Sequence, residues 1–593
     1  MAKTTPKKLS YKTEWDLSLF YTSAKDPQIA KDLEKAQRDI MAFAKKYKNK
    51  DFTKDTKSLL SALQDHEKLE EQNELSKIAR YFGFRRELNA KDVEAEARLN
   101  ELSQIGAKLS NEVVFFTLKL GKISKAEQEK YLRDPKLKKY HYSLKTLFDN
   151  ANFLLTEPEE KIMTVKYLTS RGMWTSGFER LLNKQTVKHK GKEIPLPEAS
   201  GKMPTLPTKE RRELYRKMAD VLYSVADFAE SEMNAVVTDK KINDELRGYK
   251  LPYEATVRGY ENDLRTVETL RKAVQKFNKT SHKFFNIKAK LLNEKKLIYG
   301  DRAARVGKVS KKVEFSDAVK IVQEEFKKTH PRFEEIFMNM LTNGQLDVYS
   351  KEGKSGGAFC AWTHGLPTFV MLNHTDDINS LSTLAHEMGH ALHAEYSKGQ
   401  GVLYEDCSTA SAEVASTFFE ALVFDSILEK ATDKEKIILL HDKLQDDIQT
   451  IFRQMACFEF EVELHNTIRE KGFLPKEDIA RLMNKHMKAY LGPVFDLEDK
   501  DGFFFVSWPH IRNFFYVYSY AFGQIVSAAM YAKYKEDPAF IGKVIEFLSA
   551  GGSDSPENIF KSIGIDVTKL DFFETGLKQI EKQVKELEKL TNK

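Results

Sequence analysis

The chain has 593 residues, of which 41% are hydrophobic and 31% charged, and its net charge of +7 comes from 95 basic and 88 acidic residues. This is the balance of a globular protein with a solvated surface. No run approaches the roughly 20 apolar residues of a membrane span. Lys and Glu are interspersed along helical stretches such as residues 581–589, which favours solvated helix faces over nucleic-acid binding. We therefore expect neither a nucleic-acid nor a membrane partner.

The first residues and the cysteines bear on cellular location. Residues 1–8 carry positive charge, but no apolar stretch follows them, so we expect no secretory signal. Cys360, Cys407 and Cys457 lie far apart and form no CxxC pair. Such cysteines are typical of reduced thiols buried as small apolar groups, not of ligands or nucleophiles. We expect a cytoplasmic protein.

The first third of the chain predicts helices. We expect a flexible tail over residues 1–14, then a helical domain over residues 15–186, with Leu19 and Phe20 as buried anchors at its start. The reason is that apolar residues recur at three- and four-residue spacing from Ile29 to Arg133. Thr156, followed by Glu157 and Pro158, predicts a helix N-cap.

A change of composition predicts a domain boundary. Residues 187–207 are rich in Lys, Pro and Gly, which indicates a linker or an exposed hairpin. Residues 208–593 would then form the catalytic domain, starting with a long helix that includes Glu213 to Ala235.

Three short β-favouring runs predict a small sheet in this second domain, at Leu297–Tyr299, Leu346–Tyr349 and Thr368–Asn373. Beyond Asp376 the pattern is helical almost to the end. The expected fold class is mainly α, with a small β-sheet close to the helix that carries the motif described next.

The most informative segment reads His386-Glu387-Met388-Gly389-His390. On a helix the two histidines, four residues apart, project from nearly the same face, so one metal ion can accept both imidazoles. Glu387 lies beside them, where its carboxylate can act as a general base; this is the physical content of the H-E-x-x-H pattern. The alternative is two buried histidines with a surface Glu.

A catalytic zinc ion needs a third protein ligand and one open position. The best candidate is Glu413, which shares a helical face with Thr417 and Glu420 at positions i, i+4 and i+7. One of the two carboxylates can bind the metal while the other orients a histidine. Glu420 remains a competing ligand. His393, one turn beyond His390, is a further alternative, although a fourth ligand would close the open position.

A third cluster, residues 508–520, is rich in aromatic side chains. Phe514, Phe515 and Tyr518 are expected to be core residues. His510, Tyr516 and Tyr520 differ, because buried imidazoles and phenols need polar partners. On a helix, Tyr516 and Tyr520 would share one face. The alternative is that both hydroxyl groups only satisfy partners in the core.

Taken together, the sequence resembles the oligoendopeptidase F family of zinc metallopeptidases, relatives of thimet oligopeptidase. The similarity extends over nearly the whole chain, and the most specific part is the joining of the His386 motif to the Glu413 segment. The stretches that carry it are Trp15–Leu17, Thr156–Glu160, Arg258–Glu261, Gly357–Cys360, Thr383–His390, Glu413–Ser416 and His510–Gly523. There are departures: the family often has Tyr where Phe359 stands, and compared with the thimet branch the interval from His510 to Tyr516 is one residue longer.

The resemblance implies a helical enzyme with a deep channel, one zinc ion per chain at its floor, and short peptides as substrates. It implies Glu413 as third ligand and His510, Tyr516 and Tyr520 as binders of the oxyanion and substrate carbonyls. The predicted activity is zinc-dependent hydrolysis of internal peptide bonds, with Glu387 as catalytic base. Residues 368–373 are expected to be an edge strand that pairs with the peptide.

Two other functions are compatible with these residues: a zinc hydrolase of a non-peptide amide, and a helical peptide-binding protein with a non-catalytic metal. The intact Glu387 argues against the second. Sequence alone gives neither the cleavage-site preference, the physiological peptide, the oligomeric state nor the native metal among zinc, cobalt and manganese. It also does not say which of Tyr516, Tyr520 and His510 binds the oxyanion.

Overall fold

The computed structural model describes residues 11–72, 74–309 and 312–592, so most of the expected N-terminal tail, residues 1–10, lies outside the described part. The described chain is mainly helical and has two small sheets, one of two strands and one of three. The predicted fold class is therefore confirmed. None of the helices in this part of the chain has the length and apolar character that crossing a bilayer requires.

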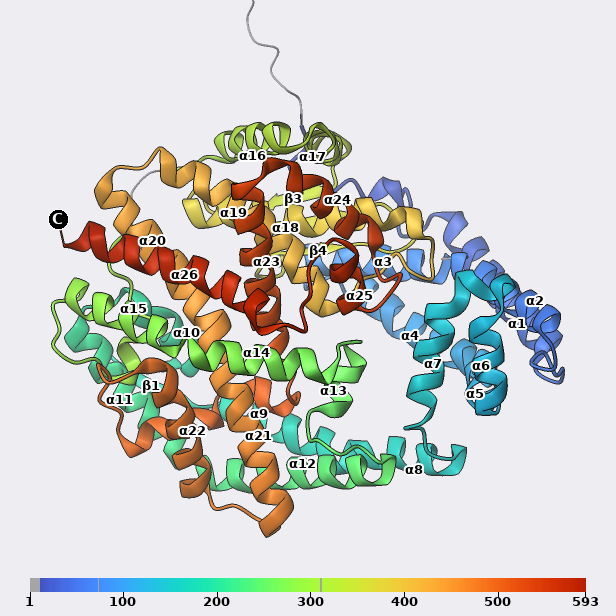
Figure 1. Ribbon diagram of the computed structural model, residues 1–593, viewed down its shortest axis with the longest axis horizontal. Helices are drawn as coiled ribbons and strands as arrows, with labels where there is room; N and C mark the ends of the chain where they lie inside the picture. The colour runs from blue at the N-terminus through green and yellow to red at the C-terminus, as the bar shows by residue number, and fades with distance from the viewer. Residues whose placement is uncertain (1–10, 73, 310–311, 593) are drawn as a thin grey trace, which may run out of the picture.

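Helices α1 to α7 gather at one end of the molecule (Figure 1, blue to cyan). Their bounds are α1 Pro27–Tyr47, α2 Thr56–Glu71, α3 Glu74–Leu88, α4 Val93–Val113, α5 Phe115–Gly121, α6 Lys125–Arg133 and α7 His141–Ala151. Phe20 is buried, as predicted, but Leu19 is 42% exposed. The prediction for Leu19 was wrong because this residue ends a short 3-10 turn, Leu17–Leu19, that buries none of its side chains.

The next segment contains two helices, α8 Glu157–Tyr167 and α9 Met173–Asn183. Thr156 caps α8 as predicted, since its N–H and hydroxyl groups donate to the Glu159 carboxylate at 2.8 and 2.6 Å. The Lys- and Pro-rich stretch forms a hairpin of β1 Thr186–His189 and β2 Lys192–Pro195, followed by helix α10 Leu196–Lys202. The domain boundary within residues 187–207 stays a prediction.

The helix predicted to include Glu213 to Ala235 is two helices, because the chain leaves helical geometry at Val225 (φ −107°, ψ 6°). They are α11 Thr208–Ser224 and α12 Ala226–Arg247. Five further helices lead to the second sheet: α13 Glu254–Gly259, α14 Leu264–Lys276, α15 Asn278–Leu291, α16 Phe315–Thr329 and α17 Pro331–Asn343.

The three-stranded sheet consists of β3 Leu346–Tyr349, β4 Phe359–Ala361 and β5 Phe369–His374, in the order β3-β5-β4. β5 runs parallel to β3 and antiparallel to β4, so it is the central strand and not the predicted edge strand. The free edge nearer the motif helix belongs to β4. Residues 297–299 do not join this sheet: Leu297 makes a single bridge to Phe495, and Tyr299 starts a 3-10 turn.

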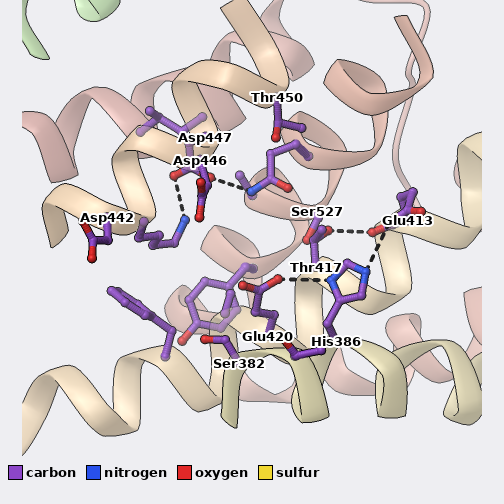
Figure 2. Close-up of a pocket in the computed structure, with 18 of the residues that line it drawn as sticks. Ser382, His386, Glu413, Thr417, Glu420, Asp442, Asp446, Asp447, Thr450 and Ser527 are labelled. Carbon is purple, nitrogen blue, oxygen red and sulfur yellow. Dashed lines mark hydrogen bonds and ion pairs between the residues drawn. The ribbon is translucent and has the colours of Figure 1, made fainter. Parts of the chain in front are cut away.

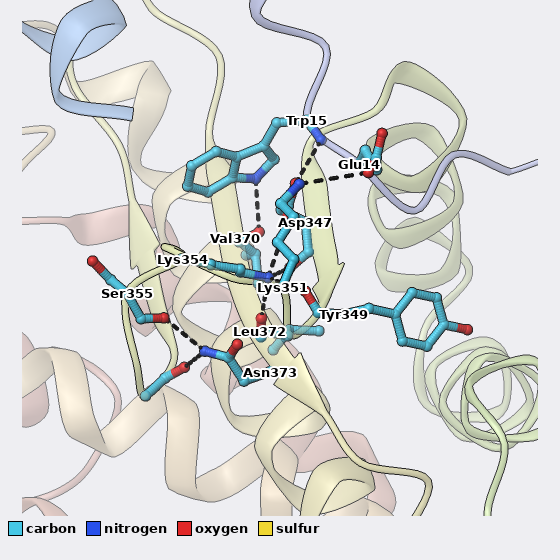
Figure 3. A network of polar contacts seen from close by, with 11 residues as sticks. Glu14, Trp15, Asp347, Tyr349, Lys351, Lys354, Ser355, Val370, Leu372 and Asn373 are labelled. Atoms are coloured by element: carbon cyan, nitrogen blue, oxygen red, sulfur yellow. Dashed lines mark hydrogen bonds and ion pairs between the residues drawn. The ribbon is translucent and has the colours of Figure 1, made fainter. Parts of the chain in front are cut away.

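A buried polar network fixes the loop before β4 (Figure 3). The Lys354 side chain is 0% exposed and its Nζ lies 2.7 Å from Asp347 Oδ1. The same Nζ donates to the backbone carbonyls of Tyr349 and Leu372. Asn373 of β5 donates to the Ser355 carbonyl at 2.9 Å. Because the middle of this loop is tied to β3 and β5, the network helps to hold β4 beside β5.

The chain beyond Asp376 is helical almost to its end, as predicted. The helices are α18 Ile378–Ser397, α19 Thr409–Glu429, α20 Asp433–Ile448, α21 Gln454–Lys471, α22 Lys476–Leu491, α23 Tyr518–Glu536, α24 Ile541–Ala550, α25 Pro556–Ser562 and α26 Leu570–Thr591. In this set α18 packs on α19, and α19 packs on α23. These three helices lie near the middle of the molecule, with α26 crossing in front of α20 and α23 (Figure 1).

Candidate metal centre and active site

The His386 motif lies on α18, and Glu413 faces it from α19. Asp377 caps α18 by accepting the Ser380 N–H at 2.8 Å. The two helices approach closely at Gly389, where a Cβ atom would come within 2.6 Å of the Ser416 Cα. The glycine inside the motif therefore serves helix packing, because any side chain there would push α19 away.

The third helix of the core approaches just as closely. At Gly523 of α23, a Cβ atom would lie 2.8 Å from the Glu413 Cβ. Glu413 is thus held between α18 and α23, and its carboxylate also accepts the Ser416 hydroxyl at 3.2 Å. Because two glycines make these approaches possible, close contacts with α18 and α23 fix the position of α19 around Glu413.

His386, His390 and Glu413 form a set whose ligand atoms all lie within 4.8 Å of one another. His386 Nε2 is 3.5 Å and His390 Nε2 is 3.9 Å from Glu413 Oε2. Bonds of about 2.0–2.1 Å in a tetrahedral site place ligand atoms about 3.3 Å apart, so the set is close to the size of a zinc site. Two imidazoles and a carboxylate are also the donor set of many catalytic zinc sites.

Glu420 occupies a different place from Glu413. Its Oε2 lies 3.2 Å from His386 Nδ1, the ring nitrogen that does not face Glu413 (Figure 2). A carboxylate at this position fixes the ring orientation and leaves Nε2 free for a metal. The geometry therefore favours Glu413 as the metal ligand and Glu420 as the carboxylate that orients the His386 ring.

Burial is the main influence on the pKa of Glu387, a residue that is only 7% exposed. Burial raises the pKa of Glu387 to about 7, and the nearby carboxylates of Glu413 and Glu420 add to the rise while His386 opposes it. Burial also disfavours the Glu413 carboxylate, but the hydrogen bond from His386 and the charges of both histidines outweigh it and lower the pKa of Glu413 to about 2. A carboxyl group whose pKa lies near 7, like that of Glu387, can both accept and return a proton at neutral pH.

His393 lies outside the ligand set of the described residues. It is 3% exposed, and its Nδ1 lies 3.7 Å from the Cys407 Sγ. Its ring packs 5.1 Å from the Phe547 ring, and burial lowers its pKa to about 3. These contacts favour a packing role for His393.

Tyr516 and Tyr520 do not lie on the same helix, so the expectation that they share one helical face was wrong. His510 lies in a 3-10 turn, Pro509–Arg512, and α23 starts only at Tyr518, which leaves Tyr516 before the helix. The three polar rings are nevertheless close together. The ring centroids of Tyr516 and Tyr520 are 5.7 Å apart, and the Tyr516 hydroxyl contacts His510 Nδ1. The predicted core residues Phe514, Phe515 and Tyr518 are buried.

A cavity of about 640 Å³ adjoins the motif helix. His386, Glu387, Glu413 and Tyr520 all line it. Tyr516 lines a neighbouring hollow with Tyr260. Of the two tyrosines, Tyr520 is therefore the one that shares a wall with the ligand set.

Sequence reasoning missed the far wall of this cavity, which α20 supplies with Asp442, Lys443, Asp446 and Asp447 (Figure 2). Lys443 Nζ lies 2.7 Å from Asp447 Oδ2, and Gln524 of α23 donates to the other Asp447 oxygen at 2.6 Å. The only signal in the sequence is a cluster of charges with i, i+4 spacing. That signal is also typical of a solvated helix face, so it could not have located a cavity wall.

Comparison with protein-family models gives the class of protein. The model of peptidase family M3 matches residues 207–579, and the model described as Oligopeptidase F matches residues 119–183. The chain belongs to peptidase family M3.

Curated relatives and solved structures extend the similarity over nearly the whole chain. The oligoendopeptidase F homolog of Borreliella burgdorferi is 24% identical over 97% of this chain and 98% of its own length. Oligopeptidase PepF of Bacillus subtilis is 32% identical, over 43% of this chain and 38% of its own length. A putative peptidase from Chlamydophila abortus superposes with a TM-score of 0.87 at 24% identity, covering 98% of this chain and 99% of that one. Oligoendopeptidase-F from Enterococcus faecium superposes with a TM-score of 0.68 at 20% identity, covering 95% and 98%.

Proposed function

We propose that this chain is a zinc-dependent endopeptidase that hydrolyses internal bonds of short peptides. The observation that carries the proposal is the convergence of His386, His390 and Glu413 on one point, with Glu387 on the wall of the same cavity. Membership of family M3 and the oligoendopeptidase relatives support peptides as substrates. One zinc ion per chain would be held by the two imidazoles and the Glu413 carboxylate.

When bound at this position, zinc would lower the pKa of a water molecule and polarise a carbonyl group. Glu387 accepts the proton of the attacking water and returns it to the nitrogen of the leaving amine. Tyr520 donates a hydrogen bond to the carbonyl oxygen as its negative charge develops. Tyr516 and His510, beside it, hold a neighbouring carbonyl of the peptide.

The free edge of β4 offers a place for the peptide backbone. An extended peptide can add to such an edge through main-chain hydrogen bonds, which bind many sequences alike. Ala358, directly before β4, lines the same cavity as Glu387, so a peptide paired with β4 would cross the metal position. The cavity would act as a channel that admits unfolded chains and excludes folded ones.

The free state of Cys360, Cys407 and Cys457 supports a reducing compartment, and we place the enzyme in the cytoplasm on that ground.

A mixed library of short peptides, digested with and without a chelator and analysed by mass spectrometry, tests the proposal. We expect internal cuts that disappear with the chelator and return with stoichiometric zinc, while folded proteins stay intact. A hydrolase of non-peptide amides would leave the library uncut but cleave small amides. A peptide-binding protein would take up zinc without turnover. Either of these results contradicts the proposal.

A further inference from the structure

The backbone directly before Tyr516 has an unusual conformation. Phe514 and Phe515 are consecutive non-glycine residues with positive φ angles of 51° and 62°. The left-handed region is disfavoured for residues with a Cβ atom, and bulky side chains adopt it only where the surroundings impose it. Strained positions of this kind cluster at functional sites.

Two side chains hold the turn by its backbone. The Phe515 N–H donates to Glu461 Oε2 at 2.6 Å, and the Thr256 hydroxyl donates to the Phe514 carbonyl at 3.0 Å. Glu461 lies on α21 and is 0% exposed. An N–H group buried without an acceptor would be costly, so the Glu461 carboxyl group stabilises this backbone conformation over others.

The two rings of the turn are fixed in the same part of the core. The Phe515 ring lies 4.6 Å from the His465 ring and 5.7 Å from the Phe458 ring, both on α21. The Phe514 ring packs under the Arg171 guanidinium group at 4.4 Å. One helix, α21, therefore supplies both the hydrogen-bond acceptor and the packing surface of the turn.

The turn leads directly into the aromatic group that faces the substrate side. The Tyr516 carbonyl accepts the Ser519 N–H at 3.0 Å and the Ser519 hydroxyl at 2.8 Å, and α23 starts at Tyr518. Since Phe515 directly precedes Tyr516, we expect a shift of the Phe515 backbone to move the Tyr516 ring and its contact with His510. Glu461 itself lines none of the cavities that hold these rings.

Position 461 lies in the core, where a hydrophobic side chain could pack and a carboxyl group is costly to bury. Burial raises the pKa of Glu461 to about 8, and its Oε2 accepts the Phe515 N–H. Its Oε1 has no hydrogen-bond partner among the described residues. Among the described residues, the Phe515 N–H is therefore the one hydrogen-bond partner of the Glu461 carboxyl group.

We propose that Glu461 is a positioning residue of the active site: it holds the left-handed Phe514–Phe515 turn from inside the core and so places the Tyr516 phenol beside His510. The inference rests on the proposed function, because it gives Tyr516 a role toward the peptide. It adds a residue that touches neither metal nor substrate.

A double-mutant cycle tests this role. We expect Glu461→Leu to raise KM for a short peptide about tenfold with unchanged zinc content, because small displacements of a binding group weaken its contact. In the Tyr516→Phe background, most of that loss should disappear, leaving less than about a threefold further change, because residues that act through one another are not additive. Glu461→Gln, which keeps an acceptor of the same length, should recover most of the activity.

The matched control is Asn234→Leu, which removes another buried acceptor of a backbone N–H, that of Leu474 at 2.8 Å, away from the cavity. It should lower thermal stability like Glu461→Leu without raising KM. If Glu461→Leu does not fold, Glu461→Asp, whose carboxyl group ends one methylene short, replaces it in the cycle.

Additive effects of Glu461→Leu and Tyr516→Phe would show that Glu461 has only a structural role and would overturn the inference. Wild-type kinetics of Tyr516→Phe would overturn it as well. Failure of the proposed function looks different: the wild-type protein would then cleave no peptide at all.

Discussion

Two regions of the molecule form the candidate active site, and they reach their geometry by opposite means. In the α18–α19 pair, His386, His390 and Glu413 project from regular helices, and close packing at Gly389 sets the distance between them. In the segment from residue 508 to Tyr520, a 3-10 turn and a left-handed turn precede α23, and contacts from α21 determine where the rings lie.

The difference has a physical reason. A metal site demands fixed ligand distances, and helix periodicity provides them within one element. A substrate-binding wall must instead follow the shape of a bound chain, which irregular backbone can do when a rigid core holds it. Substitutions in the helix pair should therefore affect metal binding and proton transfer. Those in the aromatic segment should affect how the peptide and its reacting carbonyl group are held.

The largest effect is expected for Glu387→Gln. The amide keeps the shape but accepts no proton, so kcat should fall by about 10²–10⁴-fold, the usual contribution of a general base. Zinc content should remain near one per chain, as measured by metal analysis after dialysis. Full turnover of the variant would show that another group is the base.

The next largest effects are expected for substitutions of Tyr520 and Tyr516 in the aromatic segment. Tyr520→Phe should lower kcat about 100-fold with KM nearly unchanged, since removing an oxyanion donor typically costs about 3 kcal/mol. Tyr516→Phe should act mainly on KM. Steady-state kinetics and melting curves on both variants check this. If both variants hydrolyse peptides normally and lose only about 1 kcal/mol of stability, the hydroxyl groups serve the core alone.

Substitution of Glu413 and Glu420, both on α19, should distinguish the metal ligand from the carboxylate that orients His386. Glu413→Ala should lose zinc on dialysis, whereas Glu420→Ala should weaken zinc affinity by about 10- to 100-fold, because Glu420 only orients the His386 ring. Competition with a chelator of known affinity measures both. A metal-free Glu420→Ala together with a zinc-loaded Glu413→Ala would reverse the assignment.

The smallest effect tests the close approach of the helices. Gly389→Ala would place a Cβ atom 2.6 Å from the Ser416 Cα, so we expect a loss of about 1–3 kcal/mol in unfolding free energy and weaker zinc binding. Gly177→Ala, on α9, is the matched control, because no atom lies within 4 Å of its new Cβ. It should stabilise the protein by about 0.4–1 kcal/mol. Equal denaturation curves for the two variants would contradict tight packing at Gly389.

By itself the sequence determined the features that depend on local periodicity. Most of the helices, the Thr156 cap and the shared face of His386 and His390 all follow from spacing and residue type. The candidate ligand set could be predicted for the same reason, because both motifs lie on uninterrupted helices.

Only the tertiary structure decided which strand is the edge of the sheet, where the helix predicted around Glu213 breaks, and how Tyr516 reaches Tyr520 from outside α23. Strand order depends on which segments pair across the fold, and this leaves no mark in the pattern of a single strand. The left-handed turn at Phe514 and Phe515 has no local signal either, since phenylalanine disfavours it. A buried carboxyl group on α21, more than 50 residues earlier in the chain, stabilises that turn, and only folding brings the two together.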